Sequence, residues 1–174
     1  DFDNLTEENI YVLDSPILTN SQFKKFKKFF SKKIKIIDCT FDIEKSLKER
    51  IDSIREEAET AVREGSTCLV LSDKNISNQK ASIPSILHVG AVHSHLVKHG
   101  LRGYCSLNVE SSDAMDTHSF AILIGVGATT VNPYLAIDSI YQRFEKKLFG
   151  KSDFETCVNK FKKSIDAGLL KIMS

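Results

Sequence analysis

The sequence lacks a strong net charge and a long apolar run, and no stretch of it is typical of a secretory signal peptide, so we expect none. Its 24 lysines and arginines almost balance its 23 aspartates and glutamates, so the formal net charge is +1. A field this weak gives no reason to expect nucleic acid or an anionic membrane as a partner. Lysines do cluster at positions 24–33, but phenylalanines alternate with them, which is typical of a solvated helix face. No apolar stretch reaches the roughly 18 residues of a membrane span, so we expect no membrane partner.

Cysteine is scarce and widely spaced. No C-x-x-C pair occurs, so the spacing of a zinc site is missing. Three of the four cysteines fall in expected core strands, where a free thiol behaves as a small hydrophobic side chain. We therefore expect a reducing intracellular compartment rather than a disulfide scaffold. The cysteines are Cys39, Cys68, Cys105 and Cys157.

Residues 65–110 organise the chain. An apolar run at 66–71 reads as a strand, and Pro84 stands where a helix can begin because the first turn needs no donor there. Gly100 ends that helix, and residues 104–109 form a second apolar run. A strand, a helical crossover and a second strand make a βαβ unit, which requires parallel strands.

The remaining segments repeat this alternation within 174 residues, enough for one domain with a sizeable core. The predicted fold is α/β with a mainly parallel sheet, and the loops after the strands should share one edge. Asp42 and Asp113 are the expected N-caps of the helices that follow them. Strands are expected at 33–39, 66–71, 104–109 and 128–131, and helices at 21–31, 43–63, 84–99, 114–124, 133–149 and 154–165.

Carboxylates and one histidine follow the predicted strands. Asp73, Glu110 and His118 could meet at the carboxyl edge of the sheet and perform acid–base chemistry, as a small stand-alone α/β enzyme would. Alternatively, helix N-termini near residues 111–113 could bind a small anion. Carboxylates at such positions more often cap helices, and we favour that interpretation.

Histidines gather in the helix expected at 84–99. His88 and His95 are a heptad apart, and His95 and His99 are one turn apart, so a helical metal face is conceivable. Position 94 is serine, and the glutamate of the H-E-x-x-H metalloproteases is therefore missing. We favour a packing role for these histidines and expect no metal. The glycines at 125 and 127 follow a helix and precede a strand, the wrong order for a dinucleotide or phosphate loop.

Several longer blocks carry a resemblance. The blocks LVLSDKN, IPSILHVGAVHSHLVKHGLR, SLNVESSDA, GVGATTVNPYLAID and KSIDAGLLKIMS occur in this order, almost without gaps. Together they resemble the central domain of the glutamate synthase large chain. Two positions depart from the family's runs. A triple histidine in the family is His93-Ser94-His95 here, and a paired histidine is His118-Ser119. Such variation favours a structural role, so we assign no catalytic residue.

The resemblance implies a piece of a multidomain oxidoreductase that converts glutamine and 2-oxoglutarate into two glutamates. In that family an amidotransferase domain releases ammonia, and a domain with FMN and an iron–sulfur cluster uses it. The electron donor is NAD(P)H or ferredoxin, and the compartment is the cytoplasm or a plastid. The central domain is related in topology to the flavin barrel but binds no cofactor itself.

The resemblance also implies how the chain is organised. We expect a single domain over residues 1–174, with an irregular lead-in at 1–14 and a junction to the FMN domain at 167–174. Its partners are then the amidotransferase and FMN domains of the same parent chain. Its task is to hold these domains in register and to help enclose the ammonia path.

Overall fold

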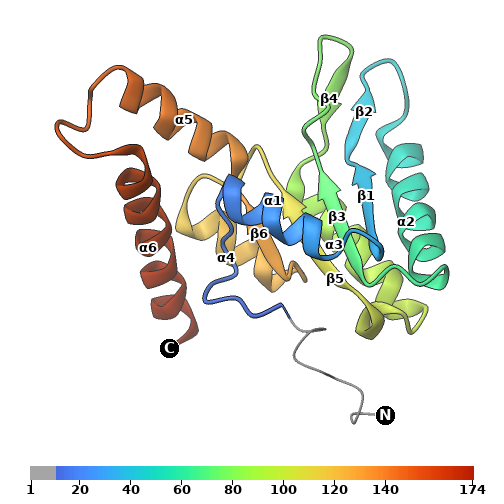
Figure 1. The fold of residues 1–174 in the computed structure, drawn as a ribbon. Helices are drawn as coiled ribbons and strands as arrows, with labels where there is room; N and C mark the ends of the chain where they lie inside the picture. Colours follow the sequence, from blue (N-terminus) through green and yellow to red (C-terminus); the bar gives the residue numbers. More distant parts are fainter. Residues whose placement is uncertain (1–10) are drawn as a thin grey trace.

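The computed structural model describes residues 11–174. Four parallel strands form its main sheet in the order β1–β3–β5–β6 (Figure 1). The prediction of an α/β fold with a mainly parallel sheet is thus confirmed, and within the described residues the sheet stays open. Of the irregular lead-in expected at 1–14, residues 1–10 lie outside the part that the structure describes. The strands are β1 (Ile34–Asp38), β3 (Cys68–Ser72), β5 (Ser106–Glu110) and β6 (Thr130–Asn132).

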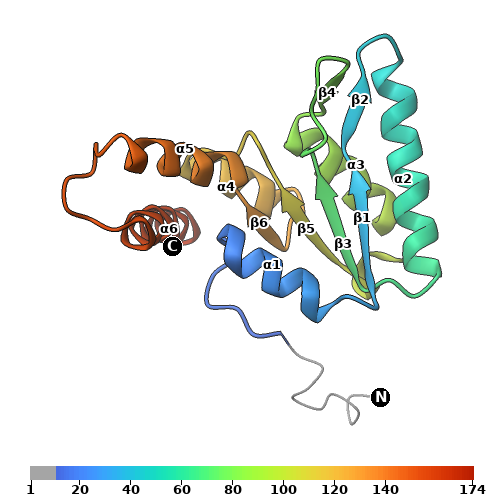
Figure 2. The same ribbon diagram turned by 45° about the horizontal axis from the view of Figure 1, so that its top comes forward.

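Helices connect the strands and cover both faces of the sheet. Helix α1 crosses one face, and α2 and α3 lie on the other (Figure 2). α5 and α6 extend to one side of the sheet, beyond β6 (Figure 1). The helices of residues 11–174 are α1 (Asn20–Phe29), α2 (Leu47–Arg63), α3 (Ser85–Lys98), the 3-10 turn η3 (Arg102–Tyr104), α4 (Thr117–Gly125), α5 (Tyr134–Glu145) and α6 (Phe154–Met173).

The central strand β3 shows why the layers form. It is buried at all five positions, as a strand covered on both faces must be. Leu69 and Leu71 belong to the larger apolar core, together with residues of α2, α3, α4 and α6. Val70 points the other way and packs with Phe23 and Phe26 of α1. Each fully buried side chain of this kind contributes about 1.5–3 kcal/mol.

A small second sheet changes one predicted helix start. β2 (Thr40–Asp42) pairs with β4 (Lys80–Ser82) in an antiparallel ladder. Because Asp42 lies in this ladder, α2 begins later, and its N-cap is Ser46, whose hydroxyl accepts from the Glu49 N–H. The expectation that Asp42 caps this helix was therefore wrong. Ile43, expected to be the first residue of this helix, lies before it and is 59% exposed.

The predicted cap of α4 also lies elsewhere. α4 begins at Thr117, and its N-cap is Asp116, which accepts from the Ser119 N–H at 2.8 Å. Asp113 instead accepts from the backbone N–H of Ser85, the first residue of α3, at 2.9 Å. The carboxylate does cap a helix as predicted, but the helix is one that precedes it in the chain.

Two further observations bear on the class of protein. No helix in the described part of the chain combines the length and apolar character of a membrane span. The four cysteines carry free thiols, and each is buried.

Candidate functional site

Glu110, the last residue of β5, lies between two lysines at the carboxyl edge of the sheet. Its Oε1 accepts hydrogen bonds from Lys27 Nζ on α1 and from Lys74 Nζ after β3, each at 2.9 Å. The side chain is 4% exposed. Burial alone raises its pKa, but the hydrogen bonds and charges of Lys27 and Lys74 outweigh burial and lower the pKa. Glu110 is therefore a carboxylate whose negative charge is balanced by lysines, and it joins α1 to the sheet edge.

Asp73 follows β3 at the same edge and is 1% exposed. Its Oδ2 accepts from the Ser112 N–H at 2.9 Å and from the Ser112 hydroxyl at 2.5 Å. Its Oδ1 is buried without a hydrogen-bond partner among the described residues. The nearby Tyr134 hydroxyl has a raised pKa, first because of burial and second because of the Asp73 charge. Asp73 thus fastens the loop after β5 to the end of β3.

Ser111 and Asp113 complete the edge. The Ser111 hydroxyl lies 2.9 Å from the Ser85 hydroxyl and donates to Asp113 Oδ1 at 2.5 Å. Burial raises the pKa of Asp113, but the bonds from Ser111 and Ser85 prevail and lower it. The free N–H group at the start of α3 already has this carboxylate as its acceptor. Asp113 thus occupies the N-terminus of α3, whereas the helix expected directly after residues 111–113 begins only at Thr117 and is capped by Asp116.

His118 lies away from these carboxylates. It is an exposed residue near the start of α4. Its positive charge helps to lower the pKa of Asp116, after the hydrogen bonds from Ser119. Within the described chain, no hydrogen bond or ion pair joins His118 to Asp73 or Glu110. The structure thus places Asp73 and Glu110 side by side at the sheet edge, where the Asp73 N–H donates to the Glu110 carbonyl at 3.3 Å, and it bonds His118 to neither.

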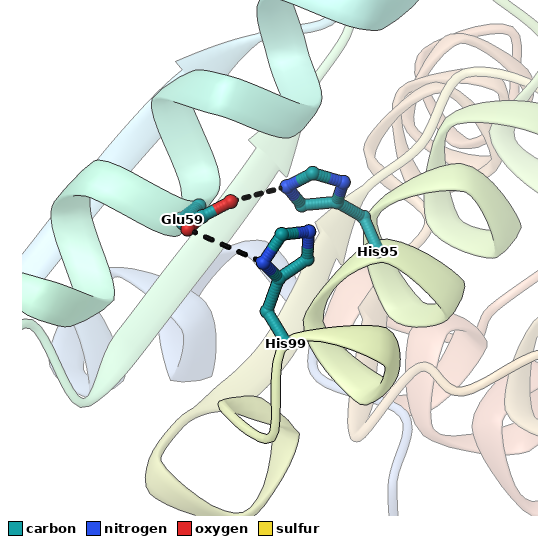
Figure 3. Close-up of side chains that lie close together, drawn as sticks. All are labelled: Glu59, His95 and His99. Atoms are coloured by element: carbon teal, nitrogen blue, oxygen red, sulfur yellow. Dashed lines mark hydrogen bonds and ion pairs between the residues drawn. The ribbon is translucent and has the colours of Figure 1, made fainter.

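The three histidines considered as a metal face, His88, His95 and His99, divide in a similar way. His95 and His99 lie side by side, with ring centroids 4.4 Å apart, and both face Glu59 of α2 (Figure 3). His95 Nε2 is 2.6 Å from Glu59 Oε2, and His99 Nδ1 is 3.5 Å from Glu59 Oε1. Sequence reasoning missed Glu59, because nothing distinguishes it from the other charged residues on the outer face of α2.

His88 is separate from this cluster and is fully buried. Neither ring nitrogen has a hydrogen-bond partner among the described residues. Burial lowers the pKa of His88 to about 4, although the Asp113 charge acts in the opposite direction. The ring is therefore neutral at physiological pH, and it serves as part of the packing between α3 and the sheet.

A groove of about 690 Å³ lies between α5 and α6. Its wall is mostly apolar, with two cationic side chains, Arg143 and Lys160. Phe149 in the wall is 36% exposed, and Met115 is 46% exposed. We call this feature the α5–α6 groove. It is lined by Met115, Ala136, Ser139, Ile140, Arg143, Phe149, Ser152, Cys157, Lys160 and Phe161.

Comparison with known proteins gives consistent matches. Residues 3–174 match the model of the glutamate synthase central domain. The chain is 44% identical over 172 residues to the NADPH-dependent glutamate synthase large chain of Azospirillum brasilense, covering 97% of this chain and 11% of that protein. It is 39% identical to the corresponding large chain of Bacillus subtilis, covering 93% of this chain and 11% of that protein.

A third relative uses a different electron donor. The chain is 37% identical over 178 residues to the chloroplastic ferredoxin-dependent glutamate synthase of Spinacia oleracea, covering 94% of this chain and 11% of that protein. The chain thus spans about a tenth of the length of these relatives. From the family match and these identities, the chain belongs to the glutamate synthase central domain family.

Proposed function

We propose that this chain is the connecting domain of a glutamate synthase, an enzyme that forms two glutamates from glutamine and 2-oxoglutarate. It holds the amidotransferase and FMN domains of the parent chain in register and helps to enclose the ammonia path. FMN, an iron–sulfur cluster and the site for NAD(P)H or ferredoxin belong to other parts of the parent. The chain itself supplies no catalytic residue. Its family membership and its share of the relatives' length support this proposal.

The main support for the proposal is that each carboxylate at the sheet edge already has a structural partner. In many α/β enzymes, this edge is where ligands bind. Here Glu110 is neutralised by two lysines, Asp73 holds Ser112, and Asp113 caps α3. A general acid or base needs a reacting group within hydrogen-bond reach and a pKa near the working pH. The pKa values of Glu110 and Asp113 are lowered instead, away from that range.

The α5–α6 groove is the surface through which the domain contacts the rest of the parent chain. Exposed apolar surface of this kind marks sites that another protein surface covers. Phe149 lies in the wall of the groove and is 36% exposed, and its neighbour Leu148 is 66% exposed. About nine-tenths of each relative lies outside the region that this chain matches. We therefore assign the groove to a neighbouring domain of the same polypeptide, which also makes ion pairs with Arg143 and Lys160.

The test uses the full-length parent enzyme. Leu148→Asp and Phe149→Asp place a charge in the apolar contact, so the domains no longer dock correctly. We expect glutaminase activity and ammonia-dependent glutamate synthesis to persist separately. The glutamate formed per glutamine hydrolysed should fall severalfold, because ammonia escapes before it is used. Ile43→Asp is the matched control, since Ile43 is an exposed apolar residue far from the groove in the sequence and should leave the ratio unchanged.

Two results would contradict the proposal. An unchanged ratio in both groove variants would show that this surface does not connect the domains. Loss of both half-reactions in a folded Glu110→Gln enzyme would instead favour chemistry at the sheet edge. Circular dichroism and gel filtration of each variant establish that it is folded, so that loss of activity is not confused with unfolding.

A further inference from the structure

Glu59, His95 and His99 place three metal-ligating atoms at one point between α2 and α3. One ligand atom from each residue lies within 4.8 Å of the others. The two imidazole rings are tilted by 35° to each other, and one nitrogen of each ring faces the carboxylate (Figure 3). His95 lies in α3, and His99 is the C-cap of this helix four residues later. Residues at i and i+4 share a helix face, so this spacing produces the convergence.

The donor set matches a particular class of ion. Two imidazole nitrogens and one carboxylate oxygen suit zinc and its divalent neighbours in the first transition series, whereas magnesium and calcium prefer oxygen ligands. Zinc–ligand distances of about 2.0–2.2 Å place tetrahedral ligand atoms roughly 3.3 Å apart. His95 Nε2 lies 2.6 Å from Glu59 Oε2, whereas His99 Nδ1 lies 3.5 Å from the other oxygen, Oε1. The three ligand atoms lie within 4.8 Å of one another, so a small rotation of the side chains has to bring them to the separation of a tetrahedral site.

The surroundings hold the carboxylate in place. Arg63, one turn after Glu59 on α2, has Nε and Nη2 each 2.8 Å from Glu59 Oε1. Oε2 is the oxygen that faces His95. A hydrogen bond of this kind to a ligating carboxylate orients it and supports metal affinity. The neighbouring side chains Ala58 of α2 and Leu96 of α3 are fully buried, so the two helices form a rigid base.

The ligands are also accessible. The side chains of Glu59 and His95 are each 20% exposed, and that of His99 is 35% exposed. A metal ion can therefore enter from solvent without local unfolding. Three protein ligands leave a fourth position of a tetrahedral ion for water or another small donor.

We propose that Glu59, His95 and His99 bind one divalent transition-metal ion, with zinc as the favoured ion. The ion joins α2 to α3 on the outer surface of the domain and stabilises their packing. The site is separate from the groove that contacts the parent chain, and it does not depend on the proposed function.

The test is a zinc titration of the 174-residue chain after treatment with a chelator. Isothermal calorimetry should give one ion per chain, and the melting temperature should rise with zinc but not with magnesium. His95→Ala and His99→Ala should each weaken zinc binding at least tenfold, because each removes one of three ligands. His118→Ala is the matched control and should bind zinc as the unaltered chain does, since it removes an exposed histidine outside the cluster.

The absorption spectrum of bound cobalt distinguishes this site from metal binding to the cysteine thiols. A nitrogen and oxygen donor set gives visible d–d bands without the near-ultraviolet charge-transfer band of a cobalt–thiolate bond. Thiolate bands, or equal zinc binding by His95→Ala and His99→Ala, would overturn the proposal. Absence of any zinc binding by the folded, unaltered chain would do the same. In that case Glu59 and His95 form only a hydrogen bond between two helices.

Discussion

Gly127 lies directly against the imidazole of His93. A Cβ atom on Gly127 would be 2.3 Å from His93 Nδ1, well inside van der Waals contact. Arg102 joins the two residues, because it donates from Nη2 to the Gly127 carbonyl at 2.8 Å and from Nε to His93 Nδ1 at 3.2 Å. Gly127 also has φ of +118°, a conformation that side-chain-bearing residues rarely adopt. This glycine therefore serves the packing of α3 against the turn after α4.

Gly127→Ala should destabilise the domain by about 3 kcal/mol, since backbone strain and overpacking each cost roughly 1–3 kcal/mol. Urea unfolding followed by circular dichroism measures the change. Gly125→Ala, at the last residue of α4, is the matched control, because a Cβ there meets no atom within 4 Å and φ is not positive. Equal effects of the two substitutions would show that contact with His93 is unimportant.

A second close approach joins α4 to α6. A Cβ on Gly168 would lie 2.5 Å from Thr117 Cγ2 and 2.7 Å from Thr117 Oγ1. Gly168→Ala should therefore destabilise the domain by about 1–3 kcal/mol through overpacking, although alanine favours a helix intrinsically. Adding Thr117→Ala removes both atoms and should recover most of the loss. A double-mutant cycle measured by thermal unfolding tests this coupling, and strictly additive effects would refute it.

The stability of the domain should fall between pH 6.5 and pH 4 because of His88. Its pKa is lowered to about 4 in the folded chain, so the unfolded chain takes up this proton first. The unfolded state then binds more protons in this window, and the free energy of unfolding decreases as pH falls. The contribution is present in full above pH 6.5 and amounts to about 3 kcal/mol, since each pKa unit corresponds to about 1.4 kcal/mol.

Urea unfolding at a series of pH values tests this dependence with His88→Leu. Leucine does not titrate and suits an apolar site, so the slope between pH 6.5 and pH 4 should become shallower. Stability at pH 7 should change little, because no hydrogen bond to His88 is lost among the described residues. Ser94→Leu is the control, because it changes an exposed position of the same helix that carries no titrating group, and it should keep the slope of the unaltered chain.

Glu110→Gln should destabilise the domain by about 2 kcal/mol. It leaves Lys27 and Lys74 facing each other without the carboxylate between them, and breaking a buried pair costs roughly 3–5 kcal/mol when both partners are buried. Both lysines are partly exposed, which reduces the cost. Chemical unfolding at pH 7 measures it.

The same carboxylate has its own acid dependence. Because its folded pKa is lowered, its stabilisation is present above its ordinary pKa and is lost as pH falls through the folded value. Glu110→Gln should therefore flatten the loss of stability below about pH 4.5, a lower window than that of His88. If the variant and the unaltered chain lost stability in parallel there, the lysine pairing would not govern the pKa.

Local patterns were sufficient to predict the main elements. The four parallel strands and the helices between them appear near their predicted positions, because β3 is mostly apolar and α2 repeats apolar residues at helical spacing. The last helix, α6, runs on to Met173 through residues expected only as a junction. Asp153 directly precedes the helix expected at 154 and caps α6, as local sequence favours for a carboxylate at a helix N-terminus. The cap of α2 was misplaced because pairing of Phe41 with Ala81 extends the chain through Asp42.

The candidate sites depended on contacts between distant segments. The sequence alone determined the alternation of strands and helices, the balanced charge and the family blocks, since these are encoded by neighbouring residues. Tertiary structure alone decided that Lys27 meets Glu110 across 83 positions and that Glu59 meets His95 across 36. It also decided that His88 lies apart from His95. Such pairings follow from how helices pack on the sheet, and the spacing of residues along one helix does not specify the neighbour that another helix presents.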